Sequence, residues 1–355
     1  MAKTRVLVVE DSLTVRMHLL ATLAADPEIE VVGEAEDGRR AIELCLQLRP
    51  DVITMDMMLP VMSGLAATEY IMAHCPTPIL VVSASVNRGE LFKTYDALAA
   101  GAVDVIDKMT GSEPEGVWER TFLAATKRVS RIRVITHPRG RLMAIDRQDR
   151  ADPRPTSVAL GGRRQVAVVG ASTGGPAAIV EVLRGLPADF QLPLLFVMHI
   201  NEPFGTAFAD WLDGQTSRRV AFAKDGDPVS SAAGRVLMAP GGTHLVVRGG
   251  KLRLTQDPER HSCRPSIDVL FESVAIEYGS SAVAGLLTGM GKDGAAGLLA
   301  IRRSGGMTIA QDEATSVIFG MPREAILLNA AARVLPLNQI GPALAAAAHT
   351  SEVRP

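Results

Sequence analysis

The chain is 355 residues long with 47% hydrophobic and 21% charged residues, which suits a globular protein of two domains. Its formal net charge of −2 gives no reason to expect binding to nucleic acid or to an anionic membrane surface. The N-terminal segment turns acidic after one short apolar run, too short for a signal peptide or a membrane span, so we expect a cytoplasmic protein without membrane insertion. The three cysteines are far apart and include no Cys-x-x-Cys pair, which predicts buried thiols rather than a disulfide framework or a zinc site: Cys45, Cys75 and Cys263.

Residues 1 to about 130 alternate short runs of strand-forming residues with amphipathic helical segments. Within residues 13–25, for example, Leu19, Leu20 and Leu23 lie at helical spacing. Such β-α repetition predicts a parallel sheet with right-handed crossovers, which is the doubly wound α/β arrangement. The five expected strands are residues 5–9, 29–35, 52–55, 78–82 and 102–106.

Polar side chains stand where four of these strands end. Glu10 and Asp11 follow the first strand, Asp56 the third and Ser83 the fourth, while Lys108 lies just beyond the fifth. The carboxyl ends of parallel strands meet at one edge of the sheet, so we expect these side chains to lie together. Three carboxylates there would repel each other unless they held a hard cation such as Mg²⁺, which could neutralise a phosphoryl group arriving at one of them. A hydroxyl and an ammonium would then suit the outer oxygens of that group.

With these five residues in this order, the first 130 residues resemble the receiver domains of response regulators, which have a flavodoxin-like fold. The resemblance implies that Asp56 accepts a phosphoryl group from a histidine kinase. It also implies that Glu10, Asp11 and the backbone carbonyl of Met58 bind Mg²⁺ together with Asp56, and that Ser83 and Lys108 contact the phosphoryl group.

Residues 131–164 break the β-α pattern and are rich in arginine, proline and glycine. A basic stretch can be an arm that binds nucleic acid. This one has no aromatic residues to stack on bases, and it includes Asp146, Asp149 and Asp152. We therefore interpret it as a solvated linker between two domains.

After the linker the β-α pattern resumes. Between two alternating runs stands the pair Gly249-Gly250, which is a strong signal for a β-hairpin. We expect a second, largely parallel sheet of the Rossmann-like kind, with the antiparallel hairpin added. The expected parallel strands are residues 165–169, 193–198, 219–223, 236–239, 283–288 and 307–311.

The segment GASTGG, residues 170–175, lies between an expected strand and an expected helix. Its small residues allow a sharp turn that would expose the hydroxyl of Ser172, as in a nucleophile elbow. A glycine loop that binds phosphate at a helix N-terminus uses the same strand–turn–helix arrangement. From this motif alone, the hydrolase and the phosphate-binding interpretations stay open.

Two further strand ends favour the hydrolase. His199 directly follows an apolar strand, and Asp293 lies in a glycine turn before a helix. His199 could deprotonate Ser172, while Asp293 would orient the imidazole and stabilise its charged form. The order Ser–His–Asp differs from the Ser–Asp–His order of ordinary α/β-hydrolases. His244 and His261 are competing bases, but neither directly ends an apolar strand.

Together, GASTGG, the strand-ending His199, RPSIDVLF (264–271) and LTGMGKDGAAG (287–297) resemble the chemotaxis-type protein-glutamate methylesterases. The resemblance implies a catalytic triad of Ser172, His199 and Asp293, with oxyanion donors at the backbone N–H groups of Thr173 and Met290. It implies no cofactor in this domain. The departure Met198-His199-Ile200, where members commonly have Gln before the histidine and Met-Pro after it, affects the local substrate contacts.

The combined resemblance covers residues 1–130 as the receiver, 131–164 as the linker and 165–345 as the catalytic domain. It implies a phosphorylation-activated enzyme that hydrolyses γ-glutamyl methyl esters on methyl-accepting chemoreceptors, with a chemosensory histidine kinase as phosphodonor. It also implies that the receiver packs against the catalytic domain and restricts access until phosphorylated. The main alternative is a non-enzymatic protein whose receiver controls a nucleotide-binding α/β module.

Overall fold

The computed structural model describes residues 3–84, 88–109, 111, 114–132, 134, 164–200, 204–205 and 207–348. The chain divides into two compact units, residues 1–148 and 149–355, and each is described here by itself. The linker predicted at 131–164 lies almost entirely outside the described residues. Within them, no helix is both long enough and apolar enough to cross a lipid bilayer.

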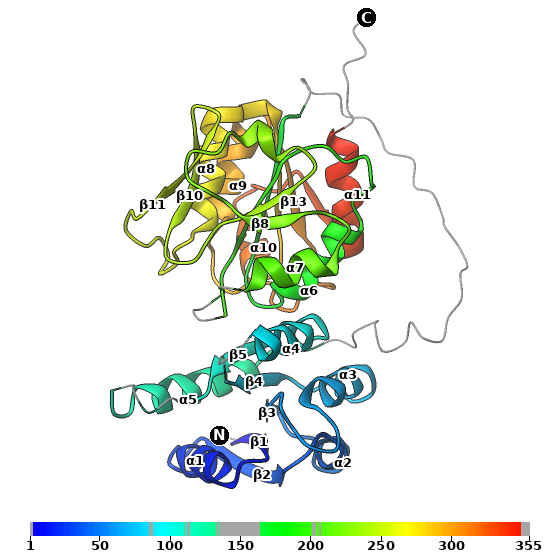
Figure 1. Ribbon diagram of the computed structural model, residues 1–355, viewed down its shortest axis with the longest axis vertical. Coiled ribbons are helices and arrows are strands. Elements are labelled where there is room, and N and C mark those ends of the chain that lie inside the picture. Colours follow the sequence, from blue (N-terminus) through cyan, green and yellow to red (C-terminus); the bar gives the residue numbers. More distant parts are fainter. Residues whose placement is uncertain are drawn as a thin grey trace, which may run out of the picture. The chain divides into compact units, whose positions relative to one another are not determined.

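The first unit is a five-stranded sheet in the order β2-β1-β3-β4-β5, with every neighbouring pair parallel (Figure 1). This order confirms the prediction of a doubly wound, flavodoxin-like sheet. Its elements are β1 (Thr4–Val9), α1 (Leu13–Ala24), β2 (Ile29–Ala35), α2 (Gly38–Leu48), β3 (Val52–Met55), α3 (Gly64–His74), β4 (Ile79–Ser83), α4 (Arg88–Ala99), β5 (Asp104–Asp107) and α5 (Val117–Ser130).

Alternating side chains of the central strands build two separate cores. In β1, Val6 and Val8 pack on one face of the sheet, against α1 and α5, while Leu7 and Val9 pack on the other face, against α2, α3 and α4. All four side chains are buried. The strands are thus apolar on both faces, as a parallel sheet covered by helices on each side requires.

The second unit contains a seven-stranded parallel sheet in the order β14-β13-β12-β6-β7-β9-β8 and a separate antiparallel hairpin, β10-β11. The prediction of a Rossmann-like sheet with an added hairpin is confirmed. Its elements are β6 (Val166–Ala171), α6 (Gly175–Arg184), β7 (Leu194–Met198), α7 (Phe208–Gln215), β8 (Val220–Phe222), β9 (Val236–Met238), β10 (His244–Arg248), β11 (Lys251–Thr255), α8 (Ile267–Tyr278), β12 (Ala282–Leu286), α9 (Ala295–Arg303), β13 (Met307–Gln311), α10 (Met321–Leu327), β14 (Arg333–Leu335) and α11 (Leu337–Ala348).

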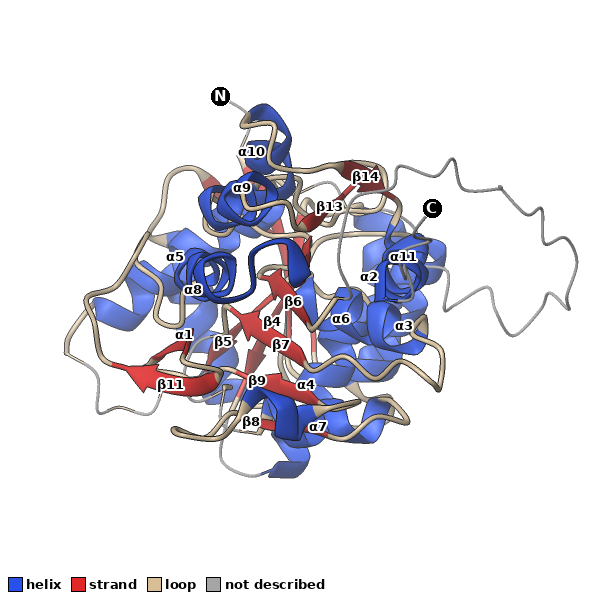
Figure 2. Cartoon of the chain, turned by 90° about the horizontal axis from the view of Figure 1, so that it is seen from above, coloured by secondary structure: helices blue, strands red, loops and turns tan. Residues whose placement is uncertain are grey.

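Strand order reverses between β12 and β6, because the chain extends the sheet from β6 through β7 in one direction and from β12 through β13 in the other. Helices α8 and α9 lie on one side of this sheet, and α6 and α11 lie on the other (Figures 1 and 2). Open α/β sheets bind ligands at such a reversal, beyond the carboxyl ends of the strands. The edge strand β14 was not predicted, since it is short and half-exposed.

Gly64, the first residue of α3, packs directly behind the end of β3. A Cβ atom at Gly64 would overlap the carbonyl oxygen of Asp56. We therefore expect Gly64→Ala to lower the free energy of unfolding of this unit by about 2 kcal/mol, since the backbone must shift to admit the methyl group. Denaturant titration followed by Trp118 fluorescence, in a Trp211→Phe background, measures this change. The control Gly214→Ala lies in α7 of the second unit, where a Cβ would meet nothing within 4 Å, and should leave the transition reported by Trp118 unchanged.

Candidate functional sites

The edge of the first sheet brings together the charged residues predicted to meet there. Nζ of Lys108 lies 3.0 Å from Oδ2 of Asp56 and 2.8 Å from Oε2 of Glu10. Asp56 and Glu10 are buried, while Asp11 is exposed. One carboxylate oxygen from each of Glu10, Asp11 and Asp56 lies within 4.8 Å of the others. Such a set of oxygen donors fits a hard divalent cation.

The electrostatics of this edge follow from its burial. Burial raises the pKa of Glu10, and the neighbouring Asp56 charge adds to that rise, although Lys108 opposes it. Burial would lower the pKa of Lys108, but the carboxylates of Asp56 and Glu10 outweigh it and the pKa is raised. The ammonium therefore stays charged beside the two acids, which keeps part of the negative charge compensated.

Ser83 and Met58, the other two residues predicted for this site, have other side-chain partners. Ser83 is the buried last residue of β4, and its Oγ accepts a hydrogen bond from Oγ1 of Thr94 in α4 at 3.1 Å. Met58 is 44% exposed, and its Sδ lies 3.3 Å from Nζ of Lys93. Thr94 and Lys93 were not predicted, because a helix residue facing a sheet edge has no signature in the sequence.

In the second unit, Ser172 stands in a tight turn directly after β6. Its N–H donates to the carbonyl of Thr288 at 3.0 Å, and its own carbonyl accepts from the N–H of Gly175 at 2.7 Å. Gly174 has a φ of +78°, and a Cβ there would lie 2.6 Å from Cβ of Val317. The turn therefore requires glycine on two counts, conformation and space. The predicted strand–turn–helix arrangement around Ser172 is confirmed.

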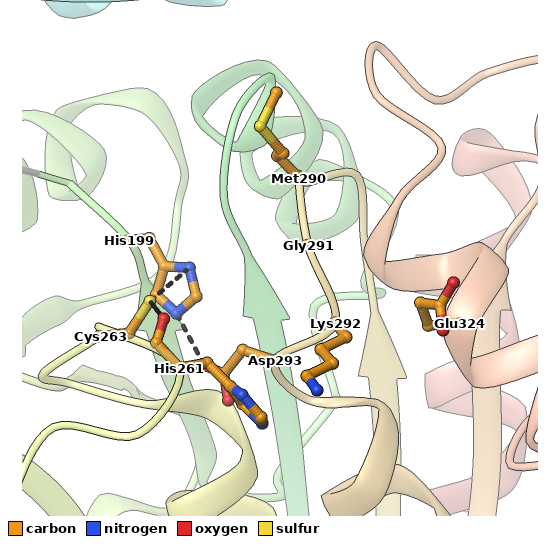
Figure 3. A pocket seen from close by; sticks show the side chains of 8 residues that line it. All are labelled: His199, His261, Cys263, Met290, Gly291, Lys292, Asp293 and Glu324. Atoms are coloured by element: carbon orange, nitrogen blue, oxygen red, sulfur yellow. Dashed lines mark hydrogen bonds and ion pairs between the residues drawn. The ribbon is translucent and has the colours of Figure 1, made fainter.

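His199 follows β7, the strand beside β6. Its N–H donates to the carbonyl of Ala171 at 3.1 Å, so His199 lies next to Ser172 across the two strand ends. Nε2 of His199 lies 2.8 Å from Oδ2 of Asp293, which follows β12 on the opposite side of β6 (Figure 3). The three strand ends β12, β6 and β7 thus deliver Asp293, Ser172 and His199 to the point where the strand order reverses.

The carboxylate of Asp293 is fixed by the N-terminus of α8. Oδ1 accepts from Oγ of Ser266 at 2.7 Å and from the N–H of Asp268 at 3.1 Å, and Oδ2 accepts from the N–H of Ile267 at 2.7 Å. A helix N-terminus offers unpaired N–H groups and a favourable dipole to such an anion. These residues belong to the segment RPSIDVLF, whose supporting contacts were not predicted.

The contact between His199 and Asp293 favours the charged form of each side chain: it raises the pKa of His199 and lowers the pKa of Asp293. Burial would lower the pKa of His199, but the hydrogen bond to Asp293 and the neighbouring Cys263 raise it to about 9. Burial would raise the pKa of Asp293, but its bonds to His199, Ser266 and Ile267 lower it. The site therefore stabilises the imidazolium that forms when His199 receives a proton during acyl transfer.

Nδ1 of His199 contacts a cysteine. Sγ of Cys263 lies 3.8 Å from Nδ1, and among the described residues no other hydrogen-bonding partner of this nitrogen occurs. Among the described residues, Oγ of Ser172 likewise makes no hydrogen bond to His199.

The prediction that all three cysteines are buried is wrong for Cys263, which is partly exposed in a loop, and right for Cys45 and Cys75.

The predicted oxyanion donors lie beside this site. Thr173 follows Ser172 in the turn, and Met290, which is 45% exposed, lines the same cavity as His199. Within the described residues, neither backbone N–H has a hydrogen-bond acceptor. Both donors are therefore available to a bound oxygen.

The competing histidines have other partners. His244 is fully buried at the start of β10, where Nδ1 accepts from the N–H of Ser266 at 3.1 Å. Nε2 of His261 lies 3.3 Å from Oδ2 of Asp268, a carboxylate whose pKa is raised by burial. His244 supports the residue that holds Asp293, and His261 is occupied by Asp268, so His199 is the histidine placed beside Ser172.

A cavity of about 470 Å³ opens over the His199–Asp293 pair. Its walls combine ionisable side chains with apolar surface. Figure 3 shows His199, Cys263 and Asp293 close together on one side and Glu324, from α10, on the other. The residues that line the cavity are His199, His261, Cys263, Met290, Gly291, Lys292, Asp293 and Glu324.

The two folds and the sequence comparisons together define the class of protein as a response-regulator enzyme, a receiver domain joined to a methylesterase domain. The sequence matches the response regulator receiver domain over residues 6–114 and the CheB methylesterase family over residues 167–344. The chain belongs to the CheB family of protein-glutamate methylesterases.

Full-length relatives support this assignment. A protein-glutamate methylesterase/protein-glutamine glutaminase 2 of Anaeromyxobacter dehalogenans is 43% identical over 340 residues, which cover 96% of each chain. A protein-glutamate methylesterase/protein-glutamine glutaminase 1 of Cupriavidus pinatubonensis is 41% identical, over 95% of each chain. A protein-glutamate methylesterase/protein-glutamine glutaminase 1 of Syntrophus aciditrophicus is 42% identical, over 95% of this chain and 96% of the length of that relative. The similarity therefore includes both units in the same order.

The His199–Asp293 hydrogen bond can be tested by titration. We expect the imidazole of His199 to titrate with a pKa of about 9, and Asp293→Asn to lower this pKa markedly, since burial remains while the carboxylate is lost. The measurement is a proton NMR titration of the ring resonances, with His199→Gln to assign the signal. The ring resonances of the exposed His74, which belongs to the other unit, should be the same in both proteins and serve as the internal control. An unchanged pKa of His199 in Asp293→Asn would show that the carboxylate does not govern the ring.

Proposed function

We propose that this chain hydrolyses γ-glutamyl methyl esters on methyl-accepting chemoreceptors and releases methanol, through the triad Ser172, His199 and Asp293. The observation that supports this most is the 2.8 Å bond of His199 to Asp293 at the sheet reversal, directly beside the turn that holds Ser172. The relatives named protein-glutamate methylesterase/protein-glutamine glutaminase supply the substrate class.

In the proposed mechanism, Oγ of Ser172 attacks the ester carbonyl while Nδ1 of His199 takes its proton. Nδ1 has this role because Nε2 is engaged by Asp293. The backbone N–H groups of Thr173 and Met290 would stabilise the negative oxygen of the tetrahedral intermediate. His199 then returns the proton to the departing methoxide, giving methanol and an acyl-enzyme. Water, activated by the same histidine, resolves the acyl-enzyme and restores Ser172.

The same route would convert receptor glutamines into glutamates. Attack of Ser172 on a side-chain amide gives the same acyl-enzyme, with ammonia as the leaving group in place of methanol. The protonated His199 is the acid that a poor leaving group such as an amine needs. The names of the relatives include this glutaminase activity.

The receiver would control the esterase. We propose that a chemosensory histidine kinase transfers a phosphoryl group to Asp56 in the cytoplasm. Mg²⁺ would be held by Glu10, Asp11, Asp56 and the carbonyl of Met58, and it would supply positive charge for the incoming phosphoryl oxygens. Ser83 and Lys108 would contact that group. The support is the convergence of three carboxylates and one ammonium at this edge. Phosphorylation of Asp56 is then expected to raise esterase activity.

The esterase and its switch can be tested together. We expect Ser172→Ala to reduce methanol release from a methylated cognate receptor by at least about 1000-fold, because triad residues act as a unit. Asp56→Ala should keep the basal rate but lose stimulation by a small phosphodonor with Mg²⁺. The exposed Ser230→Ala, on the same unit as Ser172, is the matched control and should behave as wild type. Nucleotide binding without any methanol release would instead support the non-enzymatic alternative.

The metal site can be tested without the esterase. Asp11→Asn should raise the Mg²⁺ concentration needed for half-maximal phosphorylation of Asp56 by at least about tenfold, because one anionic ligand is lost. Phosphorylation by acetyl phosphate is followed on a phosphate-affinity gel. Glu43→Gln, an exposed carboxylate on α2, is the control. An Asp11→Asn protein with the Mg²⁺ dependence of wild type would rule out this residue as a ligand.

A further inference from the structure

The loop that contains Cys263 places a thiol against the proposed base. Sγ of Cys263 lies 3.8 Å from Nδ1 of His199, and the opposite ring nitrogen is bonded to Asp293. Figure 3 shows the sulfur on one side of the imidazole and the carboxylate beyond the other. A base that is oriented by a carboxylate on one side can deprotonate a nucleophile that lies on its other side. Cys263 is therefore one member of a Cys–His–Asp cluster that includes two residues of the proposed triad.

The thiol is held in this position by the turn that contains it. The N–H of Cys263 donates to the carbonyl of Arg260 at 3.0 Å, and the N–H of Arg260 donates back to the carbonyl of Cys263 at 3.2 Å. The guanidinium of Arg260 is itself bound by both carboxylate oxygens of Glu272, at 2.5 and 2.8 Å. Sγ also donates to the carbonyl of His261 at 3.4 Å. These contacts keep the sulfur beside the imidazole.

Cys263 is also open to small reagents. Its side chain is partly exposed and lines the cavity of about 470 Å³, together with the cationic or ionisable side chains of Lys292 and His261. Neighbouring positive charge and partial exposure are the conditions under which a cysteine reacts as a thiolate. The other two cysteines, Cys45 and Cys75, are buried in the receiver, where their sulfur atoms lie 3.7 Å apart.

We propose that Cys263 is a modification site that reacts with hydroperoxides. His199 takes the proton of the thiol, and the thiolate attacks one peroxide oxygen. The S–O bond forms as the O–O bond breaks, and the leaving hydroxide or alkoxide takes the proton back from His199. Cys263 becomes a sulfenic acid, oxidised by two electrons, while the peroxide is reduced to water or an alcohol. Two equivalents of a small thiol reverse this: the first forms a mixed disulfide with Cys263 and releases water, and the second restores the Cys263 thiol and leaves with the first as their disulfide.

The modification would stop the esterase, a consequence that rests on the proposed function. The new S–OH group lies where Sγ already contacts Nδ1 of His199, and it can donate to that nitrogen a hydrogen bond stronger than that of a thiol. Nδ1 is the atom that must accept the proton of Ser172. An oxidised Cys263 would therefore occupy the base and narrow the entrance to the cavity.

The test treats the full-length protein with hydrogen peroxide and measures two quantities. Mass spectrometry after dimedone trapping reports sulfenic acid at each cysteine, and methanol release reports the esterase. We expect the dimedone adduct on Cys263, loss of methanol release in step with it, and recovery with dithiothreitol when dimedone is left out. Cys263→Ala and Cys263→Ser should need at least about tenfold more peroxide for the same fractional loss. Cys45→Ala should keep the wild-type peroxide sensitivity.

Two results would overturn the proposal: no adduct on Cys263 at peroxide concentrations that inactivate the enzyme, or equal peroxide sensitivity of wild type and of both Cys263 variants. Failure of the proposed function gives a different result. In that case an adduct would form on Cys263 with no methanol release before or after treatment, which supports the reactive thiol and removes only its consequence for an esterase.

Discussion

The catalytic unit depends on one buried anion, the carboxylate of Asp293, and on what compensates its charge. Three donors from the start of α8 and one imidazole surround its two oxygens. A buried carboxylate without such partners would be protonated or would destabilise the fold. Because the donors belong to a helix packed on the sheet, they fix the carboxylate before any substrate arrives. The carboxylate in turn fixes the ring of His199 through Nε2, with Nδ1 next to Sγ of Cys263. The orientation of the base is thus a consequence of helix packing.

In the other unit, the carboxylates are compensated less completely than that of Asp293. There, Glu10, Asp11 and Asp56 crowd one sheet edge, and the described cation that contacts two of them is Lys108. The anions are left only partly compensated, which suits a site that must attract a cation and then a phosphoryl group. Both sites use the carboxyl ends of parallel strands, where the backbone holds side chains rigidly and leaves their tips accessible. One fold class therefore supplies both the proposed site for acyl transfer and the proposed site for phosphoryl transfer.

Much of this could be predicted because strand ends are visible in the sequence. Asp56, Ser172 and His199 each directly follow an apolar run. Because the carboxyl ends of parallel strands meet at one edge of the sheet, the sequence alone predicts that each lies at such an edge. The supports could not be predicted in the same way. Ser266 binds Asp293 from 27 residues away, and Cys263 meets His199 across 64 residues. Such contacts arise from loop and helix packing, and the spacing of apolar residues in the sequence does not predict them. Cys263 looked like a buried thiol because burial of a loop residue depends on its neighbours in space.

The proposed mechanism requires that Ser172 be the nucleophile that the His199–Asp293 pair activates. Labelling with a fluorophosphonate, which phosphonylates activated serines, tests this most directly when the modified peptide is identified by mass spectrometry. We expect one adduct, on Ser172, which fails to form in Asp293→Asn although the protein stays folded. An adduct on another residue, or labelling of Ser172 that is as fast in Asp293→Asn as in wild type, would contradict it.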